Sequence, residues 1–507
     1  MADGEWRMVK LINYRARDRV FAQDHFARVR PIVGDTLAAA SVALVGLPQA
    51  APLVRYLAAC GVRRWVWVDP PDDSSATLQT YLRAQHGEAL SLEARACPWS
   101  EWVTTARREK PDLLLAVGGR SRLEEALAIA RQGQLPALLV AWPTLTQPCQ
   151  AIASFPGDPP LELGVLAGRS LSTTPVDEWG WATAAPLCAG LARTILLRHT
   201  PYARADLAAL WPAGLRVMTL GGPADPLAVA WSALPLSPPA AFQTAAGIFR
   251  TPQARRGKLL IAGLGSLGSL AAMHLVDHAA GLILADPDRV DPFNPVRQAY
   301  PLAAIGRPKA QALAGELLAA GRHEIVALTE ALVDEAEVEA LVNRYGLTAA
   351  LVVTGTAADF AIARALRRCD VPHLVGRCYP RARYWEAIIV DGRRGPALSD
   401  IRGRLPPGPA PPPTPEQIAA YSEAGALEAE PATLIESGWA AVWLARLTAQ
   451  LLAPPGLRER WFLNLLAAEQ TCLVGGVEVE STPRGPAYGV EWPGMIRGWR
   501  RANIGLS

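Results

Sequence analysis

Two stretches of the chain, 217 positions apart, share one order of apolar and polar positions. Residues 258–275, KLLIAGLGSLGSLAAMHL, predict a buried strand that leads through a glycine-rich turn into an apolar helix. Residues 41–57, SVALVGLPQAAPLVRYL, predict the same strand and helix, but their turn keeps a single glycine. After each stretch the chain has a second apolar run, and each of these runs is followed by an aspartate, Asp69 in the first case and Asp286 in the second.

These stretches belong to a longer repeat. PDLLLAVGG around Gly118 matches AALVVTG around Gly355, and the apolar segment 179–197 matches 437–452. Alternating strand and helix patterns of this kind predict an α/β fold with two tandem Rossmann-like domains. Two unrelated doubly wound domains with similar spacing are the alternative. We place the domains at 1–235 and 257–453, with a linker at 236–256 and an unassigned C-terminal extension at 454–507.

The amino-acid composition limits the kinds of molecule that the protein is expected to bind. Half of the 507 residues are apolar, and the net charge of +3 is spread over 50 basic and 47 acidic side chains. No long basic block favours a nucleic acid, and no apolar run reaches the roughly 20 residues that span a bilayer. The seven cysteines lack the spacing of a zinc site or a redox motif. We therefore expect a globular cytoplasmic protein that binds neither nucleic acid nor membrane.

The glycine-rich turn of the second half predicts a nucleotide site. Gly263, Gly265 and Gly268 follow a strand and open a helix, so the backbone can approach a phosphate there. Asp286, at the end of the next strand, is placed to bind ribose hydroxyls. In the first half, Ala51 stands where the last of these glycines would be, and we expect that half to have lost its nucleotide.

The segment 286–313, DPDRVDPFNPVRQAYPLAAIGRPKAQAL, makes the assignment more specific. It resembles the adenylation domain of the ubiquitin-activating-enzyme superfamily, which includes the ThiF and MoeB types. The resemblance implies that ATP and magnesium are bound. It also implies that Arg297 and Lys309 contact the phosphates, and that Asn294 and Ser269 belong to the same network. Only four residues of this arginine-rich chain are lysines, which adds weight to Lys309.

The magnesium ligand of the family is harder to place. The resemblance implies an aspartate just after the fourth strand, whereas this chain reads VVTGTAADFAIARAL, with alanines at 357 and 358 and the acid at Asp359. Asp359 is therefore either the metal ligand or the N-cap of the helix that follows.

The first half resembles an inactive partner fused to an active one. Residues 13–26, NYRARDRVFAQDHF, resemble the arm from which one half of the family's dimers sends an arginine into the other half's site. The resemblance implies that Arg17, or its neighbour Arg15 or Arg19, reaches the nucleotide across a pseudo-dimer interface. An ordinary basic N-terminal helix is the alternative.

The crossover loop of the family corresponds to residues 402–432, a proline-rich segment without cysteine. Three routes for the activated acyl group remain open. It passes to a partner's nucleophile, it forms an ester on Ser422, or Cys378 receives it; we favour the first.

Taken with the resemblance, these features predict ATP-dependent adenylation of the C-terminal carboxylate of a small ubiquitin-like or sulfur-carrier protein. The acyl acceptor is a conjugating enzyme, a sulfur donor or a peptide amide. Two other functions stay open: a nucleotide-free pseudoenzyme scaffold, and a less favoured NAD(P)-dependent oxidoreductase that would use the same glycine turn.

Overall fold

The two large sheets of the described residues share the same order of their first six strands. The computed structural model describes residues 36–46, 49–68, 110–141, 149–157, 178–197, 257–319, 324–378, 384–393, 397–399 and 433–454, strands at 93–96, 216–220, 229–233, 472–476, 481–482 and 485–486, and a few single residues. Arg17, the arm at 13–26, Asp69, the linker at 236–256 and the proline-rich loop with Ser422 lie outside the described residues.

The first sheet has eight strands, and its first five in spatial order are parallel. Three antiparallel strands continue it at one side. In spatial order the strands are β3 (Glu93–Ala96), β2 (Arg64–Trp67), β1 (Ser41–Val45), β4 (Leu113–Val117), β5 (Ala137–Ala141), β6 (Cys149–Ser154), β7 (Arg216–Leu220) and β8 (Val229–Ala233).

The second sheet has seven strands and repeats this order of five parallel strands followed by antiparallel ones. In spatial order they are β11 (Ile325–Leu328), β10 (Gly281–Ala285), β9 (Lys258–Ala262), β12 (Leu347–Val352), β13 (His373–Cys378), β14 (Tyr384–Val390) and β15 (Cys472–Gly476). Strand β15 comes from the segment 454–507, so part of that extension belongs to the second sheet. A separate pair, β16 (Ser481–Thr482) and β17 (Gly485–Pro486), follows it.

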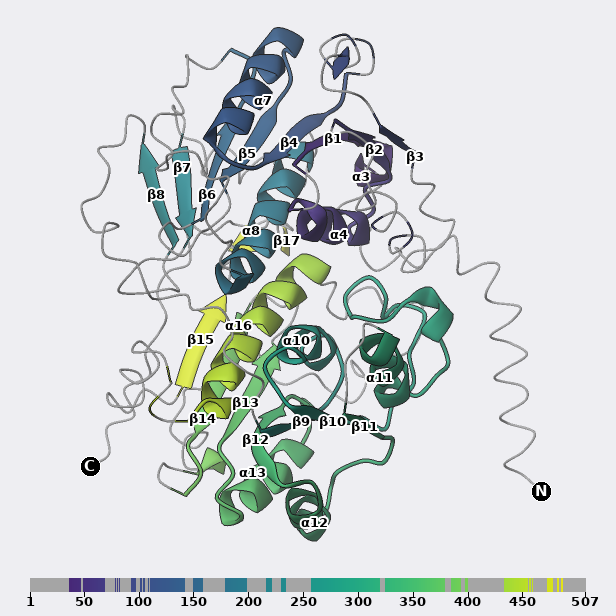
Figure 1. The fold of residues 1–507 in the computed structure, drawn as a ribbon, viewed down its shortest axis with the longest axis vertical. Coiled ribbons are helices and arrows are strands. Elements are labelled where there is room, and N and C mark those ends of the chain that lie inside the picture. The colour runs from purple at the N-terminus through teal and green to yellow at the C-terminus, as the bar shows by residue number, and fades with distance from the viewer. Residues whose placement is uncertain are drawn as a thin grey trace, which may run out of the picture.

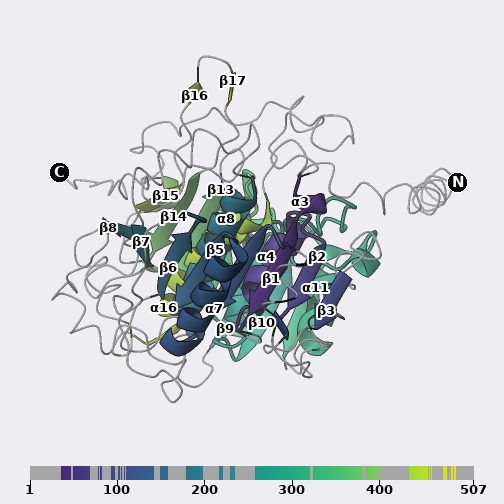
Figure 2. The same ribbon diagram turned by 90° about the horizontal axis from the view of Figure 1, so that it is seen from above.

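Helices cover both faces of each sheet, as a buried parallel sheet requires. The helices of the first half are α3 (Thr36–Ala39), α4 (Ala51–Ala59), α7 (Arg120–Gly133) and α8 (Glu178–Leu197). Those of the second half are α10 (Gly268–Leu275), the short 3-10 helix η4 (Leu302–Ala304), α11 (Lys309–Ala319), α12 (Glu335–Tyr345), α13 (Ala358–Arg368) and α16 (Leu434–Leu452). Figures 1 and 2 show α7 on the outer side of the first sheet, where its apolar face packs on the strands. Helices α12 and α13 cover the outer face of the second sheet in the same way.

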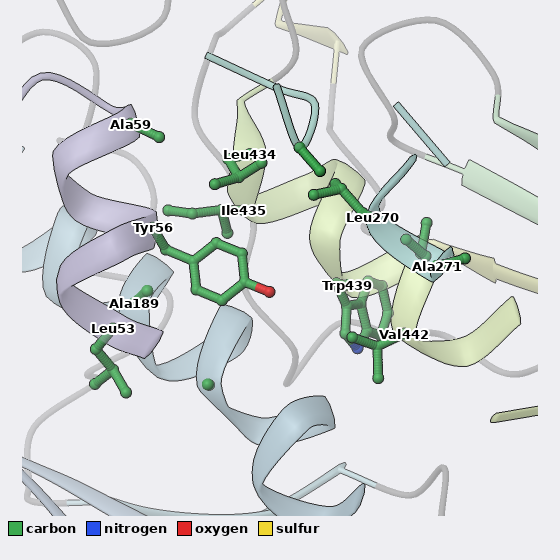
Figure 3. Packing of buried hydrophobic residues seen from close by; sticks show 14 of the residues in the cluster. Leu53, Tyr56, Ala59, Ala189, Leu270, Ala271, Leu434, Ile435, Trp439 and Val442 are labelled. Carbon is green, nitrogen blue, oxygen red and sulfur yellow. The ribbon is translucent and has the colours of Figure 1, made fainter. Parts of the chain in front are cut away.

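The two halves meet through the helices on their inner faces. One apolar core contains side chains from α4 and α8 of the first half and from α10 and α16 of the second. In Figure 3, Tyr56 of α4 points toward α16, next to Ile435. A Cβ built on Gly438 of α16 would lie 2.6 Å from the ring of Tyr56, so glycine permits this close approach.

A buried ion pair crosses the same boundary. Arg193 of α8 donates from Nη1 to the hydroxyl of Thr433 at 3.0 Å and from Nη2 to Glu436 Oε1 at 2.6 Å. Thr433 and Glu436 also form the capping box that begins α16. Burial alone would raise the pKa of Glu436, but the Arg193 guanidinium and its hydrogen bonds hold that pKa below its ordinary value. The cap of α16 is thus held by a side chain from the other half.

Among the helices that the structure describes, none is both long enough and apolar enough to cross a bilayer.

Candidate active site

The glycine turn of the second half lies at the carboxyl end of β9, next to the end of β12. This is the position where the strand order reverses, the usual ligand crevice of an open α/β sheet. Gly263 has φ +90°, and a Cβ there would lie 2.6 Å from the carbonyl oxygen of Val353. A Cβ on Gly268 would overlap the carbonyl oxygen of Gly263, whereas Gly265 faces open space. Two of the three glycines are therefore needed to form the turn, and the third leaves its outer side accessible.

Two side chains hold the turn at Leu264. Asp286 Oδ2 accepts a hydrogen bond from the Leu264 amide at 2.6 Å, and its Oδ1 accepts one from the Asp288 amide at 2.8 Å. The Tyr300 hydroxyl donates to the Leu264 carbonyl oxygen at 2.7 Å. Burial, with Asp286 and Asp288 nearby, raises the pKa of Tyr300 well above its ordinary value, which keeps the hydroxyl protonated as a donor. Sequence reasoning missed Tyr300, because its partner is a main-chain atom 36 positions away.

The predicted cation Lys309 is the first residue of α11 and is largely buried. Its ammonium lies 2.8 Å from Oδ2 of Asp288, and its amide donates to the Asp288 carbonyl at 2.9 Å. The carboxylate side chain of Asp288 is 66% exposed, so this ion pair lies at the edge of the site. An incoming phosphate could therefore compete with Asp288 for Lys309.

The remaining predicted residues of this segment have structural contacts. Asn294 is buried, and its Oδ1 accepts a hydrogen bond from the Asp291 amide at 3.0 Å. Arg297 is half-buried and donates its amide to the Asn294 carbonyl. Ser269 is fully buried; its hydroxyl donates to Gly265 O at 2.7 Å and accepts from the Ala299 amide at 3.2 Å. Ser269 thus ties the segment that carries Arg297 to the glycine turn.

Asp359 lies in the first turn of α13, directly after the end of β12. Ala357 occupies the N-cap position, so the expectation of Asp359 as the cap is wrong by two residues. Its carboxylate is fully buried. Oδ1 accepts from the Thr354 hydroxyl at 2.6 Å and from the Thr354 amide at 3.1 Å, and Oδ2 pairs with Arg377 Nη2 at 3.1 Å.

This arrangement does not suit a magnesium ion. Mg²⁺ requires oxygen ligands in octahedral geometry and usually takes one or two carboxylates with several waters. The one acid at the expected place already binds a guanidinium and a hydroxyl. Magnesium binding through Asp359 stays a prediction that this geometry does not favour.

The first half keeps part of the same turn. Gly46 has φ +98°, and a Cβ on it would overlap the carbonyl oxygen of Val117 on the neighbouring strand, as Gly263 approaches Val353 in the second half. Ala51, however, is the counterpart of Gly268, and a Cβ is not tolerated in the geometry of the second turn. At Gln49, the described end of the first turn, the carbonyl accepts a hydrogen bond from the indole Nε1 of Trp181 at 3.1 Å.

Cys378 is the last residue of β13 and is partly buried against the inner core. It follows Arg377 and so lies near the carboxyl edge of the sheet.

Comparison with known proteins matches part of the second half to one protein family. Residues 243–370 match the sequence model of the ThiF family. No curated protein matches the chain. The solved structure of E. coli MccB with ATP has 13% sequence identity over 45% of this chain and 64% of that chain, with a TM-score of 0.32. The structure of PaaA has 17% identity over 44% of this chain and 61% of that chain, with a TM-score of 0.30. The chain thus spans less than two thirds of these solved chains.

Proposed function

We propose that the second half binds ATP and uses it to adenylate a carboxylate, because residues 243–370 match the ThiF family model. The observation that carries this proposal is the glycine turn held open at Gly265, with Asp286 on one side and Lys309 nearby. The turn begins α10, whose first amides and dipole favour an anion.

The side chains around the turn have distinct roles in this proposal. Amides at the start of α10 receive the phosphates. Asp286 uses one lone pair on each oxygen for the turn, and the remaining lone pairs can accept ribose hydroxyls. Lys309 and Arg297 compensate the charge that accumulates when an anion attacks a polyphosphate.

The reaction is a nucleotidyl transfer. An oxygen of the substrate carboxylate attacks the α-phosphorus of ATP, the bond from that phosphorus to the bridging oxygen breaks, and pyrophosphate leaves. The product is an acyl-adenylate. The chain's contribution is to position both anions and to compensate their charge, since neither of them needs to lose a proton at this step.

The C-terminal carboxylate of a small ubiquitin-like or sulfur-carrier protein is our proposed substrate, and a partner's nucleophile is the proposed acceptor. The first half is proposed to be an inactive copy that completes a pseudo-dimer and lends Arg17 to the nucleotide. The support for the pseudo-dimer is the shared strand order and the helix interface.

A nucleotide-free scaffold is the second candidate. The observation in its favour is the engagement of Asp359 by Thr354 and Arg377, because that carboxylate cannot then bind a metal without rearrangement. The intact turn at Gly263 to Gly268 argues against it, since Gly265 serves no packing purpose.

Calorimetric titration with ATP, and separately with NAD, tests the proposal. Lys309→Ala should weaken ATP binding by about tenfold or more, because a charge-assisted contact to phosphate is lost. Lys258→Ala is the matched control: this lysine begins β9 at the opposite edge of the sheet and pairs with Glu324. NAD should not bind. Absence of ATP binding in a folded wild-type protein would favour the scaffold, and NAD binding would favour the oxidoreductase.

A further inference from the structure

The carboxylate of Asp359 has a fixed cation as its partner. Arg377 lies near the carboxyl end of β13, two residues beyond the last one that pairs with β12, and its Nη2 lies 3.1 Å from Asp359 Oδ2. The side chain of Asp359 is fully buried, while that of Arg377 is 26% exposed. The guanidinium is therefore held by a buried carboxylate and stays partly exposed near the carboxyl end of β13.

Further contacts fix the direction of Arg377. Its guanidinium carbon lies 5.8 Å from the centre of the Phe360 ring, within range of a cation–π interaction. In the antiparallel pairing of β13 with β14, Arg377 stands directly opposite Glu386. A guanidinium offers five donors, of which Asp359 accepts only one in the geometry described.

The same region approaches the nucleotide turn. A Cβ on Gly263 would lie 2.8 Å from the Cα of Thr354, and Thr354 donates twice to Asp359. A continuous set of contacts thus leads from the glycine turn through Thr354 and Asp359 to Arg377.

We propose that the guanidinium of Arg377 takes the position beside Asp359 that a divalent cation would otherwise occupy. The inference rests on the proposed function and deepens it: the second half would bind ATP with a cation supplied by the protein. Asp359 would then be the positioning residue for Arg377, and not a metal ligand. Nucleotide binding would depend little on free magnesium.

The test measures ATP affinity in excess magnesium and in excess EDTA for the wild type, Arg377→Met and Arg377→Lys. The wild-type affinity should change by less than about threefold between the two conditions, and Arg377→Met should weaken binding in EDTA by about tenfold or more. Magnesium should partly restore Arg377→Met, because Asp359 is then available to a metal. Arg377→Lys should keep most of the affinity in EDTA. Arg367→Met is the matched control, since Arg367 is on α13 but donates to the Gly392 carbonyl, away from Asp359.

A second readout needs no nucleotide. Mn²⁺, followed by electron paramagnetic resonance, should bind to Arg377→Met and not to the wild type. Loss of wild-type ATP binding in EDTA, or Mn²⁺ binding to the wild type that Arg377→Met does not increase, would overturn the inference while leaving adenylation intact. Failure of the wild type to bind ATP under any condition would overturn the proposed function, and the Mn²⁺ comparison would still decide the role of Arg377.

Discussion

At the scale of single residues, the three glycines of the second turn have different tasks. Gly268→Ala places a Cβ on the carbonyl oxygen of Gly263, a backbone atom that cannot move away cheaply. Gly265→Ala places its Cβ in open space. We expect Gly268→Ala to lower the free energy of unfolding by about 2 kcal/mol or more. Gly265→Ala should leave stability within about 0.5 kcal/mol and lower ATP affinity, because the added methyl lies where a phosphate would approach.

Chemical denaturation and calorimetry on the same two variants separate these effects. If Gly265→Ala binds ATP as tightly as the wild type, the phosphates do not bind at this turn. Equal stability of the two variants would mean that the turn does not need its last glycine.

At this scale the sequence was sufficient for the local structure that follows from neighbours along the chain. The strand, the glycine spacing and Asp286 are close in sequence, and the turn has the expected close approaches. Sequence reasoning could not find Tyr300 or Arg377, since their partners follow β9 and β12 and are fixed by the way β9, β12 and β13 lie side by side. It also left Asp359 undecided, because a carboxylate before a helix fits a metal, a cap or an arginine equally well.

At the scale of elements, β13 begins with a fully buried histidine. The Nδ1 atom of His373 lies 2.9 Å from the Val371 carbonyl, and Nε2 has no hydrogen-bond partner among the described residues. Burial, which outweighs the hydrogen bond to Val371, lowers the pKa of His373 to about 4. The folded strand therefore holds this ring neutral where the unfolded chain would protonate it.

Because His373 is held neutral in the folded state, we expect the free energy of unfolding to fall in mild acid. Above pH 6.5 the ring is neutral in both states and contributes no pH dependence. As the pH falls from 6.5 to about 4, only the unfolded chain takes up the proton, which favours unfolding by up to roughly 3 kcal/mol. Urea denaturation at several pH values should show this slope in the wild type and a shallower one in His373→Leu. Equal slopes would mean that the ring is accessible to water.

The order of the central elements was predictable from the sequence, since β1, β4, β9 and β10 are largely apolar runs with turn residues after them. Gly46 and Gly263, assigned to equivalent turns by spacing alone, both have φ between +90° and +98° and both approach the carbonyl of a neighbouring strand. Strand β15 was not predicted, because its pairing with β14 joins segments separated by the proline-rich loop and α16.

At the scale of the whole molecule, the buried ion pair between Arg193 and Glu436 joins the two halves. Removing one partner of a buried pair leaves the other charge without compensation, which typically costs about 3–5 kcal/mol. Glu436→Gln should therefore lower the free energy of unfolding by several kcal/mol. Glu335→Gln is the control: Glu335 pairs with Arg364 and Arg368 at the surface, where such pairs contribute about 0–1 kcal/mol.

Thermal and urea unfolding of both variants would measure the difference. A cost for Glu436→Gln no greater than that for Glu335→Gln would mean that water reaches the interface. The outcome also bears on cooperativity, because one apolar core with side chains from both halves predicts a single unfolding transition.

The shared core also affects how the two halves can change over generations. Helices α4 and α8 of the first half bury their apolar faces against α10 and α16, and α10 starts at the nucleotide turn. Substitutions on those faces would disturb a site in the other half, whereas the first half's own turn is free to drift once it binds nothing. We therefore expect a library of random variants to tolerate changes around Gln49 far better than changes at Tyr56 or Arg193. A first half that no longer binds nucleotide would then be retained because the second half packs against it.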